Sequence, residues 1–129
     1  MTDIKISKAE QYFHEVLTWR RVLEFFKDEN SFLKTRLSKV VDQHTDKNFL
    51  ELAEQYQNNF ILKDDYINEL RHEINFQESK LKETIEADLK IPNKVVLNKQ
   101  TQLRNEIEFL EKEFTKLKNE FNKYLNTIL

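Results

Sequence analysis

The sequence predicts an all-α protein, an elongated antiparallel up-down-up bundle of three helices with coiled-coil-like heptad packing. The 129-residue chain contains no glycine and a single proline, which disfavours the tight hairpins and positive-φ turns of strand-rich folds. Apolar residues recur at alternating spacings of three and four, the pattern of a helical heptad whose a and d positions face a core. The two breaks in this pattern are short, so consecutive helices should lie antiparallel. We therefore expect residues 1–129 to form one domain.

The first helix is predicted over residues 7–42. Ser7 and Glu10 have the spacing of a capping box, which marks a helix start. The core positions follow without a slip, and they are Ala9, Tyr12, Val16, Trp19, Leu23, Phe26, Asn30, Leu33, Leu37 and Val40. Residues 28–31 are the one place where a break is conceivable. A break there would give the alternative fold, a four-helix up-and-down bundle.

The second helix is predicted over residues 46–89, with Thr45 or Asp46 as its cap. Lys63 and Gln77 interrupt its apolar positions, which are Phe49, Ala53, Tyr56, Phe60, Ile67, Leu70, Ile74 and Leu81. Beyond Leu81 the apolar stripe drifts toward Leu89. Pro92 should end the helix, because proline lacks an amide hydrogen and disfavours helix at the preceding residue.

The third helix is predicted over residues 94–128, with Asn93 as a plausible cap. Its core pattern is the most regular of the three, and it comprises Val96, Gln100, Leu103, Ile107, Leu110, Phe114, Leu117, Phe121, Tyr124 and Ile128. The second helix is acidic whereas the first and third are mildly basic. This charge pattern is consistent with ion pairs across both grooves.

Composition excludes several classes of function. The formal net charge is −2, which gives no general basis for binding nucleic acid or an anionic membrane. No apolar run approaches the roughly 18 residues that indicate a membrane span. Without cysteine there is no disulfide, thiol nucleophile or thiolate metal ligand. We expect a cytoplasmic protein with no nucleic-acid or membrane partner.

No catalytic, cofactor or metal site is predicted. Glu69 and His72 have the spacing used by carboxylate-bridged metal sites, but such sites need the motif twice, facing inward. His14 and His72 both fall at the f position, farthest from the core. Without glycine, no loop can shape a phosphate cradle or an oxyanion hole in the usual way. We therefore expect a non-enzymatic protein without a cofactor.

Polar residues near the core predict an internal polar layer. Folding the chain at the two breaks brings four polar residues to one level, namely Asn30, Asn59, Lys63 and Glu120. Such a layer fixes helix register at a cost in stability, as a core asparagine does in coiled coils. The alternative is a small polar cavity that binds a metal or small ligand within a four-helix bundle.

Large apolar residues outside the heptad core predict a partner-binding face. They lie mostly at c positions, which should face water in a three-helix bundle, and the candidates are Phe25, Phe32, Leu62, Phe76 and Phe109. Exposed apolar residues that recur at helical spacing suggest a surface that packs against another helix. We expect a protein that acts by protein–protein association, as a homo-oligomer (most simply a dimer) or by docking a partner helix. The partner itself is not identified by the sequence.

Overall fold

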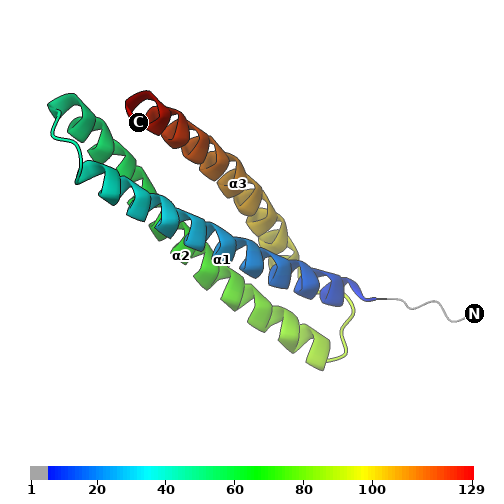
Figure 1. Ribbon diagram of the computed structural model, residues 1–129. Helices are drawn as coiled ribbons and strands as arrows, with labels where there is room; N and C mark the ends of the chain where they lie inside the picture. The colour runs from blue at the N-terminus through cyan, green and yellow to red at the C-terminus, as the bar shows by residue number, and fades with distance from the viewer. Residues whose placement is uncertain (1–5) are drawn as a thin grey trace, which may run out of the picture.

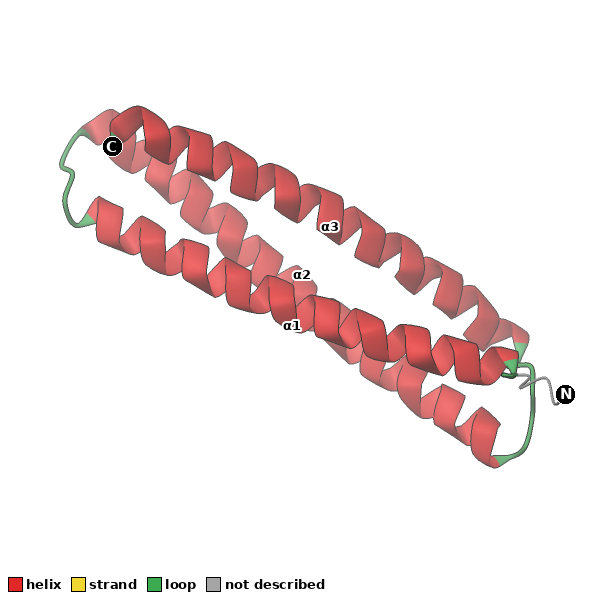
Figure 2. Cartoon of the chain, turned by 45° about the vertical axis from the view of Figure 1, so that its right-hand side comes forward, coloured by secondary structure: helices red, strands yellow, loops and turns green. Residues whose placement is uncertain are grey.

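The computed structural model describes residues 6–129, which form three long helices packed side by side (Figures 1 and 2). The helices are α1 (Lys8–Val41), α2 (Lys47–Glu86) and α3 (Lys94–Ile128). Two short loops reverse the chain, so α1 and α3 run parallel and α2 runs opposite to both (Figure 1). The all-α, three-helix, up-down-up fold is therefore confirmed.

Each helix begins at a side chain that accepts a hydrogen bond from a free backbone amide of the first turn. Ser7 Oγ accepts from the amide of Glu10 at 3.2 Å. In α2 the cap is Asp46, which accepts from the amide of Asn48 at 3.1 Å. In α3 Asn93 accepts from the amide of Val96 at 3.0 Å. These caps satisfy amides that have no partner inside the helix.

Helix α1 is continuous from Lys8 to Val41 and shows no break at residues 28–31. Its heptad pattern runs through this segment, and Asn30 occupies a core position there with no exposed surface. The alternative four-helix fold is therefore wrong. An unbroken apolar stripe outweighs the weak helix propensity of Asp, Asn and Ser in residues 28–31.

Helix α2 ends at Glu86, three residues before the predicted end. The amide of Leu89 bonds to the carbonyl of Thr84, and the amide of Asp88 bonds to the carbonyl of Ile85, both at 3.0 Å. This is the Schellman pattern, which places a left-handed residue just after the helix. That residue is Asp88, with φ of 57°. Because the chain has no glycine, the usual marker of such an ending is missing.

Replacing Asp88 with glycine should stabilise the protein by about 0.5–1 kcal/mol, because glycine adopts positive φ without steric cost. The substitution also removes a negative charge from the negative end of the α2 dipole. Urea unfolding monitored by circular dichroism measures the change. Ala87→Gly, one residue earlier at negative φ, is the matched control and should destabilise. A loss of stability in Asp88→Gly would contradict this account of the helix end.

The core lies along the predicted heptad positions of all three helices, except near the end of α3, where Leu125 is buried and the predicted Tyr124 is only partly buried. Aromatic rings join the helices across it: Phe26 packs on Phe114 at 5.0 Å between centroids, and Phe60 meets Phe121 edge-to-face at 5.1 Å. The largest fully buried side chains are Phe60, Phe114, Phe121, Leu23, Leu33, Ile67, Leu70, Ile74, Leu81, Leu103, Leu110 and Leu125. Burial of these side chains is the main stabilising contribution, at roughly 1.5–3 kcal/mol for each large apolar one.

Ion pairs between the helices flank the core, and they show which turns of neighbouring helices lie side by side. They pair Arg20 with Glu78, Lys34 with Asp64 and Glu24 with Arg71 between α1 and α2, Glu15 with Arg104 and Glu29 with Lys118 between α1 and α3, and Glu73 with Lys99 between α2 and α3. Three acidic side chains of α2 thus meet basic ones on the two neighbouring helices, whereas Arg71 of α2 meets an acidic one on α1. Exposed pairs of this kind contribute well under about 1 kcal/mol each, so they select the arrangement rather than hold it together.

Candidate functional site

The five candidate partner-binding side chains all lie on the outside of the bundle. Their exposed fractions run from 56% to 64%, unusually high for large apolar residues, and the residues are Phe25, Phe32, Leu62, Phe76 and Phe109. Single exposed apolar residues are common on soluble proteins, but a recurring series is not.

Phe25 and Phe32 flank the junction of α1 with α3. They lie one heptad apart, and Glu29 lies between them on neighbouring turns of α1. Glu29 pairs with Lys118 of α3 at 3.2 Å. Residues three and four apart on a helix are neighbours, so both rings border the side of α1 that faces α3. We call these two residues the α1 pair.

The remaining candidates flank the junction of α2 with α3. Phe76 and Val95 line a groove between the two helices, and Leu62 and Lys116 line a second depression farther along the same junction. Phe109 follows Gln102 of the first groove by one heptad and precedes Lys116 of the second by one heptad. The predicted partner-binding face is therefore two separate surfaces, because the c positions of α1 border a different neighbour.

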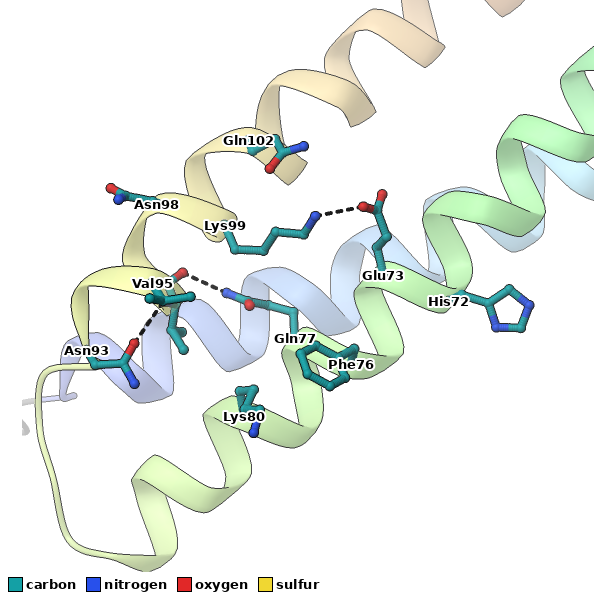
Figure 3. Close-up of a pocket in the computed structure, with 11 residues that line it drawn as sticks. His72, Glu73, Phe76, Gln77, Lys80, Asn93, Val95, Asn98, Lys99 and Gln102 are labelled. Carbon is teal, nitrogen blue, oxygen red and sulfur yellow. Dashed lines mark hydrogen bonds and ion pairs between the residues drawn. The ribbon is translucent and has the colours of Figure 1, made fainter.

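The groove at Phe76 has a volume of about 870 Å³. Figure 3 shows Phe76 on α2 and Val95 on α3, on opposite sides of the groove, with Val95 nearer the α2–α3 loop. The ammonium group of Lys80 lies 5.3 Å from the centroid of the Phe76 ring. Lys99 and Glu73 bridge the two helices at 2.7 Å (Figure 3). The groove thus has apolar walls and a charged rim, an arrangement suited to an apolar side chain from another helix.

The predicted internal polar layer is only partly formed. Asn30 is buried, and its amide nitrogen donates to the carbonyl of Phe60 at 2.8 Å and to Asp64 Oδ1 at 2.7 Å. The second carboxylate oxygen of Asp64 pairs with Lys34. Asn30 Oδ1 has no partner within the described residues. The partner of Asn30 is thus Asp64, which the sequence prediction did not include.

The other three predicted members of that layer lie at the surface. Asn59 and Glu120 are exposed and Lys63 is half-buried, and all three line the shallow depression of about 200 Å³ beside Leu62. Their placement inside the bundle is wrong. Lys63 occupies a core position of the heptad, but its long side chain can keep the ammonium group in water. Asp64, one residue later, reaches Asn30 instead.

A second polar cluster, which the sequence prediction missed, joins all three helices. Gln77 Nε2 donates to the carbonyl of Val96 at 2.9 Å and to Gln100 Oε1 at 3.0 Å. Gln100 Nε2 in turn donates to Glu15 Oε1 at 2.8 Å and to the carbonyl of Tyr12 at 3.2 Å. The sequence signal for this cluster was the presence of two glutamines at core positions of adjacent helices. We call this the glutamine cluster.

Glu15 ends the glutamine cluster and is held by a two-point contact with Arg104. Arg104 Nε donates to Glu15 Oε2 at 2.8 Å, and a terminal nitrogen donates to Oε1 at 2.6 Å. Burial acts to raise the pKa of Glu15, but the hydrogen bonds from Arg104 and Gln100 and the charge of Arg104 outweigh it and lower this pKa. Glu15 therefore remains ionised in the folded protein at neutral pH.

Within residues 6–129, no group of three or more His, Cys, Asp and Glu side chains is placed to hold a metal ion. None of the helices in that range has the length and apolar character needed to cross a bilayer. No protein-family model matches the chain, and no curated protein or solved structure matches it.

Proposed function

We propose that this protein is non-enzymatic and acts through protein–protein association, with a second copy of itself as its partner. The observation that carries the proposal is the set of exposed apolar side chains on a bundle whose core is already complete. Because the buried core needs none of them, they are free to pack against another chain. Their recurrence at helical spacing supports docking against another helix.

The energetics favour association over a purely solvated surface. Burying a large apolar side chain contributes roughly 1.5–3 kcal/mol, and phenylalanine has only two side-chain torsions to immobilise. A few such residues clustered in a groove can supply most of the free energy of an interface. The charged rims formed by Lys80, Lys99 and Glu73 would then contribute specificity.

The alternative, a metal or ligand site near the polar layer, is the weaker proposal, although Asn30 Oδ1 has no partner within the described residues. That proposal required a four-helix bundle, and α1 is unbroken. The buried side-chain amide nitrogens of Asn30 and Gln77 both donate to protein acceptors. The cytoplasmic location expected from the sequence stays a prediction.

Light scattering coupled to size-exclusion chromatography tests self-association on the full chain. We expect a dimer whose population rises with protein concentration over the micromolar range. Variants that place glutamate at two exposed phenylalanines, either Phe25 and Phe32 or Phe76 and Phe109, identify the surface involved. Gln11→Glu with Thr35→Glu, at exposed polar positions of α1, is the charge-matched control. A wild-type chain that stays monomeric up to millimolar concentration would overturn the proposal.

A further inference from the structure

The apolar residues along the α2–α3 junction form an ordered series. Because the two helices are antiparallel and Glu73 bonds to Lys99 and Gln77 to Gln100, Phe76 lies near the level of Lys99. Farther along the junction, Leu62 lines the same depression as Glu113 and Lys116. Read from the α2–α3 loop, the order is therefore Val95, Phe76, Phe109, Leu62. We call these four residues the α2–α3 surface. Its members come alternately from α3 and α2.

From the loop outward, the four residues come from α3, α2, α3 and α2 in turn. In the reverse order the two helices alternate in the same way, with α2 first instead of α3. A two-fold axis perpendicular to the helices, passing between Phe76 and Phe109, brings Phe76 beside Phe109 of a second copy. The same rotation brings Val95 beside Leu62 of the second copy. Each layer of the resulting contact holds one apolar side chain from each copy. This is the self-complementarity that an isologous dimer requires.

We propose that two copies associate antiparallel through the α2–α3 surface, an inference that rests on the proposed self-association. The charges at the two ends of the α2–α3 surface support a second copy of the chain as the partner. Lys80 lines the groove near Val95, and Glu113 lines the depression near Leu62. The two-fold axis places Lys80 of one copy beside Glu113 of the other, twice per dimer. It likewise brings Glu83 toward Lys116.

The opposite orientation is disfavoured by the same charges. If the two-fold axis ran along the helices, each residue at the contact would approach its own counterpart. Lys80 would then meet Lys80, and Glu113 would meet Glu113. Like charges opposed across an interface cost free energy, whereas complementary ones fix the register. The charge pattern therefore selects the antiparallel arrangement.

The contact is large enough for a stable but modest dimer. The stretch of α3 from Val95 to Lys116 is roughly 30 Å long at 1.5 Å per residue, and two adjacent helices are about 20 Å wide. The product is about 600 Å² per copy, or about 1,200 Å² in total, which is the lower end of specific interfaces. Glu69, near the axis, approaches its own counterpart and lowers affinity. A micromolar dissociation constant is expected.

Charge exchange between Lys80 and Glu113 tests the arrangement by sedimentation equilibrium. Lys80→Glu alone should weaken the dimer about tenfold, because two new carboxylates face the Glu113 carboxylates. The double variant Lys80→Glu with Glu113→Lys should restore wild-type affinity. Lys39→Glu on α1, exposed and remote from the groove, is the matched control and should leave the dissociation constant unchanged. Glu69→Gln should tighten the dimer.

Apolar substitutions separate this inference from the broader proposal. Phe76→Glu with Phe109→Glu should give a folded monomer, with helicity by circular dichroism as the folding check, while Phe25→Glu with Phe32→Glu should remain dimeric. A dimer lost only through the α1 pair would overturn the α2–α3 surface and leave self-association standing. A dimer insensitive to Lys80→Glu, or not restored by the double exchange, would overturn the antiparallel arrangement. A wild-type monomer would overturn both proposals.

Discussion

Replacing Phe60 with alanine should lower the free energy of unfolding by about 3–5 kcal/mol, the loss typical of deleting a buried phenyl ring. Phe60 is fully buried in the middle of α2. Its ring meets Phe121 of α3 edge-to-face and stacks near Tyr56. Three rigid helices cannot collapse around the vacated space, so the cavity cost adds to the lost burial.

The size of this effect matters because a domain has only about 5–15 kcal/mol of stability in total. Urea unfolding, followed by circular dichroism at a concentration where both proteins have the same oligomeric state, measures the change. Phe32→Ala removes the same ring from an exposed position of α1 and should change stability by less than about 1 kcal/mol. Comparable losses in the two variants would contradict the assignment of the core.

Gln100→Glu should cost about 3–5 kcal/mol at pH 7, although it changes one atom of the side chain. Gln100 is fully buried and donates to Glu15 and to the carbonyl of Tyr12. A carboxylate cannot donate, and it would lie against the ionised Glu15. Burying an unpaired charge beside a like charge carries a penalty of this size.

This penalty should depend on pH in a defined direction. Burial and the Glu15 charge raise the folded-state pKa of the introduced carboxyl above the unfolded value of about 4.3. The full loss is therefore present above the folded pKa, and it shrinks as the pH falls toward the unfolded value. Gln55→Glu makes the same substitution at an exposed position of α2 and is the control. It should leave the free energy of unfolding unchanged. A deficit that did not shrink between pH 7 and pH 4.5 would refute the burial of the charge.

The helices could be predicted from the sequence because their heptads are regular. The unbroken spacing through Asn30 predicts one helix rather than two, and the caps Ser7 and Asn93 fix two helix starts. The end of α2 could not be predicted, since Asp88 takes the left-handed position where glycine is the usual signal. A local sequence pattern therefore predicts the start or end of a helix well where the usual residue type occupies that position.

Polar contacts inside the bundle were harder to predict than the apolar core. An apolar side chain is buried whenever it lies on the face of the helix that points to the core, whereas a hydrogen bond needs a partner atom within about 3 Å. The prediction placed Asn59 and Lys63 beside Asn30, whereas the side chain that reaches Asn30 is Asp64, one residue after Lys63. Gln77 and Gln100 lie at positions recognised as core, but their pairing depends on the register of α2 against α3. The exposure of Phe76 and Phe109 followed from the heptad alone, while the groove that Phe76 lines did not.

An odd number of helices places the start of α1 and the end of α3 at opposite ends of the rod (Figure 1). Tension applied at those two points pulls parallel to the long axis. Neighbouring helices must then slide past each other, so every core layer resists the load together. In a bundle with an even number of antiparallel helices, both points lie at one end, and the same tension would open the layers one after another. The geometry is therefore one that bears stretching along its length.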